Sequence, residues 1–314
     1  MTIFVAMTSK REHSELSLGV KVFRTAILPV QKLPLGFHYA WGRFFAWLAS
    51  SVLHYRRDVV MVNLSRSFPG LKWKEVRDMA KDFYRHFGDI LAEAVWFGGC
   101  RGNVARLRRS GLCRVINPEV LDSAFDKGKS VMVLCSHQGN WELLGGIFEF
   151  LEDRTRICVD DIVVVYKSLS SRFWDQFIRG NRLSVVHDGF EGYVESHDIL
   201  RKAVSERRNG KVYVFPTDQF PYSGATRHDV GLFLNQPTLA MTGGAALASR
   251  FGMPVLYLGM NRTGAGKYEM SFTEICPDAS LMSAEEIMVG FYRLLEEDVL
   301  KDPANYLWSH NRWK

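Results

Sequence analysis

The chain has 314 residues, enough to bury a full core as one large domain or as a domain with an appended layer. Its five cysteines are an odd number with no Cys-x-x-Cys pair, which argues against a disulfide framework or a zinc site and indicates a reducing compartment. Residues 1–15 lack the apolar core of a signal peptide, so no cleavable leader is expected.

Charge is distributed unevenly along the chain. Residues 1–110 hold 18 Lys and Arg against 8 Asp and Glu, a net charge of +10, whereas the whole chain has a net charge of only +6. A basic N-terminal third indicates an anionic surface nearby, which could be a membrane, a nucleic acid or an acidic protein. A basic segment can also serve solubility alone, so the charge by itself does not identify a partner.

The segment LPLGFHYAWGRFFAWLASSVL, residues 33–53, has one formal charge, Arg43, among many aromatic residues. Its length nearly suits a membrane span, but Arg43 would cost about 2.5–3.5 kcal/mol at the centre of a bilayer. The Trp and Tyr residues and the following Arg56-Arg57 favour a helix in the interface of an anionic membrane. A true span and a buried core helix are the alternatives. We expect residues 1–57 to form a basic, aromatic, helical region that associates with membranes.

Residues 73–95 have apolar positions at helical spacing and predict a long helix packed on a core. From residue 116 short apolar runs alternate with amphipathic segments, which predicts an α/β domain over residues 58–314. We expect a mixed, mostly parallel sheet flanked by helices, with an antiparallel edge formed by a hairpin at Gly264. The expected helices are 118–127, 140–151, 170–180, 196–208, 237–250 and 283–301, and the expected strands are 130–135, 161–166, 183–187, 211–216, 254–260 and 268–275.

His137 follows directly after the apolar run 131–135, and Glu142 comes five residues later. Active sites of α/β sheets lie at the carboxyl ends of strands, where His137 is expected. A carboxylate bonded to one imidazole nitrogen fixes the tautomer and frees the other nitrogen to accept a proton. With nine histidines and 34 acidic residues, about one such pair is expected by chance, so the position after a strand carries the argument.

Other chemistries fit the pattern less well. The spacing matches none of the zinc motifs, so neither a metal nor another cofactor is expected. Cys135 could be a nucleophile, but it lies on the expected strand. The Gly-rich stretch 241–249 lacks the spacing of a phosphate loop.

The stretch SHQGNWELLG, residues 136–145, resembles the His-x4-Asp/Glu motif of glycerolipid-type acyltransferases. In its Gly-Asn-Trp-Glu form it is similar to the motif of the late lipid A acyltransferases, the lauroyl- and myristoyl-transferases. Further stretches resemble the same family in order along the chain, so that the resemblance covers about residues 30–314. These stretches are residues 55–71, 78–93, 215–256 and 306–314.

The resemblance implies transfer of an acyl group from a thioester, usually on acyl carrier protein, to a hydroxyl of a lipid. His137 would take the proton from the hydroxyl, and Glu142 would orient the imidazole. A thioester is already activated, so no metal, cofactor or acyl-enzyme is needed. The tetrahedral intermediate needs a cation or an amide donor, for which Arg179 and Arg182 are the candidates.

Further candidates surround the same edge of the expected sheet. Four of them are expected to position the substrate. Two of the four lie in the motif, and the other two follow the strand 211–216, where a structural turn is the alternative reading. They are Asn140, Trp141, Asp218 and Gln219. Cations near expected strand ends would bind phosphates of the acceptor, and these are Lys167, Arg179, Arg182 and Arg262.

These features together predict a membrane-associated enzyme that moves a long-chain acyl group from acyl carrier protein to a lipid A precursor. It is expected on the cytoplasmic face of the bacterial inner membrane. The alternatives are the same chemistry on another acceptor, such as a phosphatidylinositol mannoside or an aminolipid, and a non-catalytic membrane- or nucleic-acid-binding protein. The continuous apolar stretch and the placement of His137 argue against nucleic acid as a partner.

Overall fold

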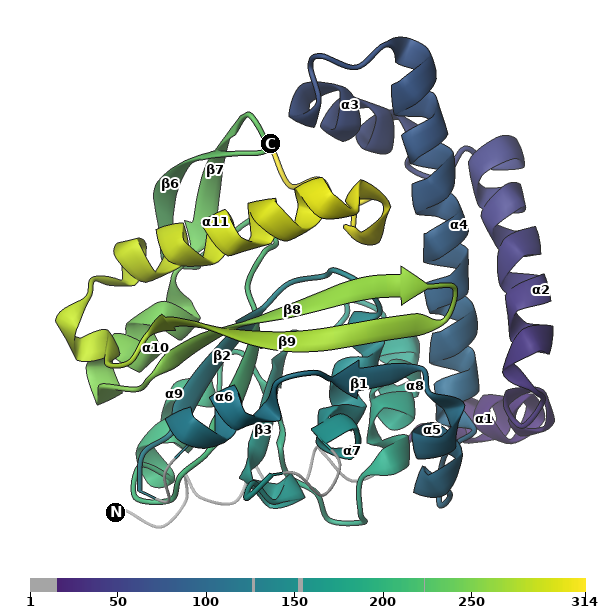
Figure 1. Cartoon of the computed structure of the whole chain (residues 1–314). Helices are drawn as coiled ribbons and strands as arrows, with labels where there is room; N and C mark the ends of the chain where they lie inside the picture. Colours follow the sequence, from purple (N-terminus) through teal and green to yellow (C-terminus); the bar gives the residue numbers. More distant parts are fainter. Residues whose placement is uncertain (1–15, 126–127, 152–154, 223) are drawn as a thin grey trace, which may run out of the picture.

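Seven strands form one sheet in the order β1-β9-β8-β2-β5-β3-β4, and a separate hairpin pairs β6 with β7 (Figure 1). The computed structural model describes residues 16–125, 128–151, 155–222 and 224–314, so the prediction that residues 1–15 hold no signal peptide lies outside the described residues. The strands are β1 (Cys113–Val115), β2 (Val131–Cys135), β3 (Ile162–Tyr166), β4 (Tyr193–Glu195), β5 (Val212–Pro216), β6 (Arg227–Phe233), β7 (Gln236–Met241), β8 (Val255–Gly264) and β9 (Lys267–Cys276).

The sheet is mostly parallel. Strand β2 runs parallel to both of its neighbours, β5 and β8, and β3 runs parallel to β5 and β4. Only the hairpin of β8 and β9 is antiparallel within the sheet. This confirms the predicted α/β fold with a mixed, mostly parallel sheet and an antiparallel hairpin.

Helices cover both faces of the sheet, which explains why the central strand is apolar throughout. All five residues of β2 are buried, and they alternate between two hydrophobic clusters, with Met132 and Leu134 on one face and the other three on the opposite face. The helices are α1 (Leu18–Gln31), α2 (Leu35–Trp47), α3 (Arg57–Ser67), α4 (Trp73–Gly98), α5 (Val104–Ser110), α6 (Pro118–Ala124), α7 (Ile147–Leu151), α8 (Arg172–Arg182), α9 (Ile199–Ser205), α10 (Gly243–Phe251) and α11 (Ala284–Lys301).

Two expected elements are wrong, and each error has a local cause. The expected strand 183–187 is a 3-10 turn at the end of α8, and the edge strand β4 forms later, at Tyr193–Glu195. The expected helix 237–250 begins only at Gly243, because β7 precedes it. The tight turn between β6 and β7 places Leu234 and Asn235 at φ +50° and +61°. A leucine rarely adopts this backbone conformation, so the sequence lacks the usual signal of a hairpin turn.

The expected helix 140–151 is divided into two short pieces. A 3-10 helix covers Trp141–Gly146 and α7 follows it directly. The two glycines that end the 3-10 helix lie close against their neighbours. A Cβ on Gly145 would collide with the Tyr193 hydroxyl, and a Cβ on Gly146 would lie 3.2 Å from Leu107. This close packing sets the chain path immediately after the motif.

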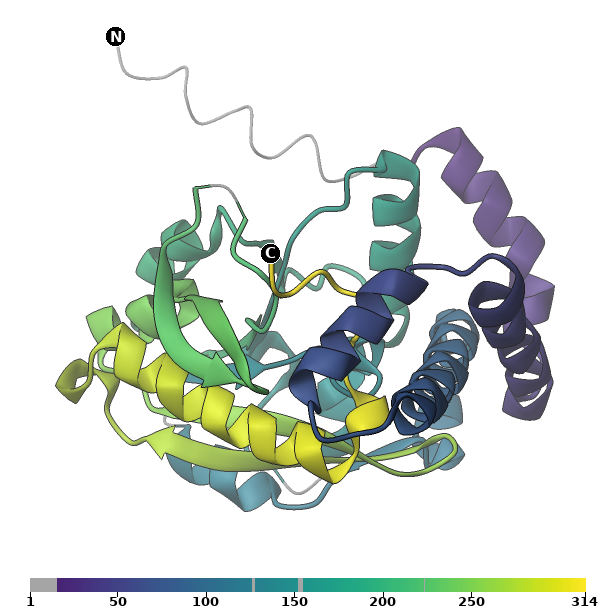
Figure 2. The same ribbon diagram turned by 90° about the horizontal axis from the view of Figure 1, so that it is seen from above.

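The aromatic segment 33–53 forms α2 and a π-helical turn, and α2 lies along α4 (Figures 1 and 2). One face of α2, with His38, Gly42 and Ala46 at helical spacing, is buried. The opposite face leaves Trp41 and Phe45 half exposed. No helix in the described part of the chain combines the length and the apolar character that crossing a membrane requires.

The contact of α2 with α4 depends on two glycines. A Cβ on Gly42 would lie only 2.5 Å from the carbonyl oxygen of Gly88 and 3.0 Å from the Cβ of Ala92. Both offending atoms belong to a helix backbone or to its first side-chain carbon, so neither can rotate away. The two helix axes can therefore approach this closely only while residue 42 has no side chain.

We predict that Gly42→Ala destabilises the fold by about 1–3 kcal/mol, because the new methyl group forces α2 away from α4. Gly36→Ala is the matched control, since Gly36 lies in the same helix with no atom within 4 Å of its added Cβ. It should be neutral or slightly stabilising. Urea unfolding followed by circular dichroism measures both, and equal free energies of unfolding for the two variants would contradict the close approach.

Candidate active site

A short turn carries the histidine away from β2 into the interior of the molecule. Gly139 has φ +58°, and its added Cβ would lie 2.6 Å from the sulfur of Met260, so both conformation and space favour glycine. The turn is held by a hydrogen bond of 2.9 Å from the backbone N–H of Gly139 to the carbonyl of Asn305. The backbone before the 3-10 helix is thus fixed by the C-terminal part of the chain.

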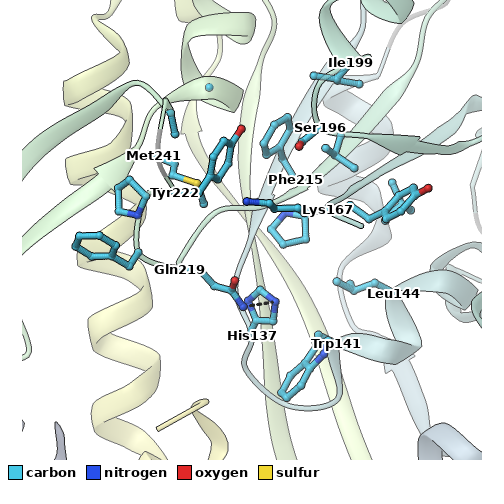
Figure 3. A pocket seen from close by; sticks show the side chains of 18 of the residues that line it. His137, Trp141, Leu144, Lys167, Ser196, Ile199, Phe215, Gln219, Tyr222 and Met241 are labelled. Carbon is cyan, nitrogen blue, oxygen red and sulfur yellow. Dashed lines mark hydrogen bonds between the residues drawn. The ribbon is translucent and has the colours of Figure 1, made fainter. Parts of the chain in front are cut away.

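The imidazole of His137 is bonded at both nitrogens. Its Nδ1 lies 2.6 Å from a carboxylate oxygen of Asp218, which is almost fully buried. Its Nε2 lies 3.1 Å from the side-chain nitrogen of Gln219 (Figure 3). Because the carboxylate only accepts and the amide nitrogen only donates, Nδ1 carries the hydrogen and Nε2 presents its lone pair.

Strand pairing explains why these residues meet. Cys135 at the end of β2 lies opposite Pro216 at the end of β5, and the two strands are parallel. Two residues further on, His137 and Asp218 therefore emerge side by side at the same edge of the sheet. This edge is where α/β sheets place their ligands.

Glu142 does not meet His137, contrary to the sequence prediction. Its two oxygens accept hydrogen bonds of 2.8 Å each from the guanidinium of Arg182, and one oxygen also accepts from the indole of Trp141 at 3.1 Å. Within the described residues, no hydrogen bond joins Glu142 to His137. The 3-10 helix directs the carboxylate toward α8, and Asp218 takes the expected place beside the imidazole. A catalytic role of Glu142 remains a prediction.

The two carboxylates sit in different electrostatic surroundings. Burial would raise the pKa of the Asp218 carboxyl, but the charge and hydrogen bond of His137 hold that pKa below its usual value. Burial likewise disfavours the charged form of Arg182, yet the paired Glu142 raises the pKa of its guanidinium overall. The site therefore holds a carboxylate that stabilises an imidazolium and a separate charged pair.

A cavity of about 860 Å³ opens beside His137, a size suited to a large ligand. His137, Trp141, Gln219 and Lys167 are among the residues that line it (Figure 3). Most of its wall is apolar, and it includes Leu144, Val164, Ile178, Ile199, Leu200, Phe215, Met241, Leu247 and Leu307. The arrangement places an imidazole with a fixed tautomer beside a large, mostly apolar space.

The other predicted residues divide into those at the cavity and those away from it. Trp141 and Gln219 line the cavity, as do Lys167 and Arg182, whereas Asp218 is bonded to the imidazole of His137 and is not among the lining residues. Arg262, on the β8–β9 hairpin, is paired with Asp302 and does not line the cavity. Arg179 lies beside Tyr166 and is not among the lining residues either. Asn140 is fully buried and bonded to Glu93, so a role in positioning the substrate remains a prediction.

Three residues that the sequence analysis missed also line the cavity. Arg250 lies in the last turn of α10, and His310 and Lys314 lie in the C-terminal tail. Burial lowers the pKa of His310 to about 4, so its imidazole is neutral near pH 7. No spacing rule links these positions to His137, because α10 and the tail reach the cavity only through tertiary folding. Among the described residues, no group of three His, Cys, Asp or Glu side chains could hold a metal ion.

We predict that ¹⁵N NMR of the histidine-labelled protein shows His137 with its hydrogen on Nδ1, assigned by comparison with His137→Gln. Asp218→Ala should remove this preference, because the carboxylate that accepts from Nδ1 is gone. Glu142→Gln should leave the His137 signals unchanged. A tautomer switch in Glu142→Gln, or none in Asp218→Ala, would contradict the hydrogen bonding described above.

The chain matches the family model of bacterial lipid A biosynthesis acyltransferases over residues 10–314. No curated protein matches the chain. The matched region is nearly the whole length and includes the motif at 136–145, His137 and Asp218. It confirms the family that the motif resembles, and it supports acyltransferase activity in general. The chain therefore belongs to the bacterial lipid A biosynthesis acyltransferase family.

Proposed function

We propose that the protein transfers a long-chain acyl group from acyl carrier protein to a hydroxyl of a lipid A precursor. One observation carries the proposal: His137 has its Nδ1 held by Asp218 and its Nε2 directed at a large, mostly apolar cavity. A base of this kind can remove a proton from a hydroxyl, and the apolar wall can hold the acyl chain that is transferred.

In the proposed reaction the acceptor hydroxyl takes the place of the Gln219 amide at Nε2 of His137. Its oxygen attacks the thioester carbonyl carbon, and its proton passes to Nε2. The carboxylate of Asp218 stabilises the imidazolium that forms. The tetrahedral intermediate then collapses with cleavage of the carbon–sulfur bond, and the leaving thiolate takes the proton from Nε2. The products are an ester and a free thiol, and His137 returns to its starting form.

Two groups beside His137 suit the negative charge of the intermediate. The amide of Gln219, once displaced from Nε2, is a hydrogen-bond donor next to the reacting carbon. The guanidinium of Arg182 lines the same cavity and keeps its charge through its pair with Glu142. We assign both to stabilisation of the oxyanion, and we do not assign it to Arg179, which lies outside the cavity.

The cations of the cavity suit a phosphorylated acceptor. Lys167, Arg250 and Lys314 line it, and within the described residues none of the three takes part in a salt bridge. Lys167 and Lys314 instead lie over the rings of Tyr222 and Phe220. They are available to phosphate groups, which the disaccharide of a lipid A precursor carries.

The exposed face of α2 suits a membrane interface. It presents large apolar side chains to solvent over more than two turns, namely Phe37, Trp41, Phe44, Phe45 and Trp47. Together with α1 it lies at the outer edge of the molecule (Figure 2), and both helices belong to the basic N-terminal third. We propose that this face rests in the headgroup region of an anionic membrane, on its cytoplasmic side, where the lipid acceptor is found.

We predict that His137→Ala lowers acyl transfer by about 10²–10⁴-fold while the circular dichroism spectrum is unchanged, because the variant lacks only the base. The assay combines a labelled acyl carrier protein thioester with four acceptors: a tetra-acyl lipid A precursor, glycerol 3-phosphate, a phosphatidylinositol mannoside and an aminolipid. Product with the lipid A precursor alone is expected. Product with one of the others alone would reassign the acceptor, and product with none would contradict the proposed function.

We predict that Trp41→Ser combined with Phe45→Ser weakens binding to vesicles containing phosphatidylglycerol at least about tenfold, because two apolar anchors are lost. Leu281→Ser combined with Val289→Ser is the matched control. Both side chains are also exposed, one just before α11 and one in its first half, and α11 begins on the side of the molecule opposite α2 (Figure 1). Cosedimentation at low salt measures both. Equal binding by the two double variants would contradict the role of α2.

A further inference from the structure

Glu93 of α4 is a buried acid outside the cavity that the reaction does not use directly. Its side chain is fully buried and accepts three hydrogen bonds, from the Tyr39 hydroxyl at 2.8 Å, the Asn140 amide at 2.8 Å and the Tyr268 hydroxyl at 2.9 Å. Burial raises the pKa of Glu93 to about 7, and the three donors oppose that rise. Such a group is costly to bury, and here all three of its neighbours are arranged as donors toward it.

The Asn140 side-chain amide connects Glu93 to the active-site turn by hydrogen bonds. Its nitrogen donates to Glu93, so its oxygen must face the other way, where it accepts from the backbone N–H of Glu142 at 3.1 Å. That bond caps the 3-10 helix that begins at Trp141. An acceptor at position 93 thus decides which way the Asn140 amide points and whether the helix carrying Glu142 is capped.

The same carboxylate joins the turn to the exposed helix. Tyr39 lies on α2, between the exposed aromatic residues, and Tyr268 lies on β9. Glu93 is therefore the point at which α2, the sheet and the turn between His137 and Glu142 are connected by hydrogen bonds. The backbone of that turn is also held by hydrogen bonds to Asn305 and Met260.

We propose that Glu93 is a positioning residue, which acts through Asn140 to hold the turn of His137 and Glu142 in its reactive geometry and, through Tyr39, ties that geometry to α2. This inference rests on the proposed function for its kinetic consequences. The hydrogen-bond relay itself can be tested without any substrate.

Two substitutions at position 93 separate hydrogen bonding from charge. In Glu93→Gln the amide oxygen can accept from Asn140 and Tyr268, while its nitrogen donates to the Tyr39 hydroxyl, so the relay is kept. In Glu93→Leu no acceptor remains and the Asn140 amide is free to turn. Val76→Ala is the matched control, because Val76 is a buried residue of the same helix that lies away from the turn.

We predict that Glu93→Leu lowers kcat at least tenfold, with KM for the thioester within about threefold of the wild type, and that Glu93→Gln stays within about threefold in both. Val76→Ala should lower the melting temperature without lowering kcat. Combining Glu93→Leu with Asn140→Ala should cost no more than either change alone, because both break the same relay. Additive losses, or an unchanged kcat in Glu93→Leu, would overturn the proposal.

The ¹⁵N spectrum of His137 gives a readout that needs no acyl transfer. Its signals should shift or broaden in Glu93→Leu and remain as in the wild type in Glu93→Gln and Val76→Ala. Should Glu93→Leu not fold, Asn140→Ala makes the same test, since it leaves Glu93 two of its three donors. Unchanged His137 signals in the folded variant would refute the positioning role, whereas altered signals in a protein without transferase activity would refute only the proposed function.

Discussion

The site depends on the parallel pairing of β2 with β5, which sets Cys135 opposite Pro216 and so brings His137 and Asp218 together two residues beyond. The contact is built into the register of the sheet. A slip of one residue would turn the side chains of one strand to the other face and separate the pair. Because all five residues of β2 are buried, a slip would force each side chain into a site packed for a different one, so the close packing of the central core also holds His137 beside Asp218.

Two side-chain pairs have separate roles around His137. Asp218 is bonded to one imidazole nitrogen, and Glu142 is paired with Arg182, so both carboxylates have a partner before any substrate arrives. In the proposed reaction the first pair stabilises charge on the base and the second keeps a guanidinium close to the reacting carbonyl. The cavity between them brings an apolar wall and unpaired cations together, which is the combination that a phosphorylated lipid requires.

Much of the fold could be predicted from the sequence. Short apolar runs such as 131–135 and 212–216, separated by amphipathic helical segments, are typical of buried strands in an α/β sheet. The place of His137 at the sheet edge could be predicted because it follows a strand. Its hydrogen-bond partner could not, because the sequence spacing favoured Glu142, while Asp218 lies 81 residues away and reaches His137 only through strand pairing. The β6–β7 hairpin was hidden by a leucine in a left-handed turn, and the boundary proposed at residue 57 remains a prediction.

A double-mutant cycle on kcat tests most directly the claim that Asp218 acts through His137. Asp218→Asn is expected to lower acyl transfer strongly in the wild type and to have no further effect in His137→Ala, because the carboxylate acts only on the imidazole. Glu142→Gln should still lower the residual rate of His137→Ala, since it acts on Arg182. A wild-type rate in Asp218→Asn, or an Asp218→Asn loss that persists in full without His137, would contradict the account.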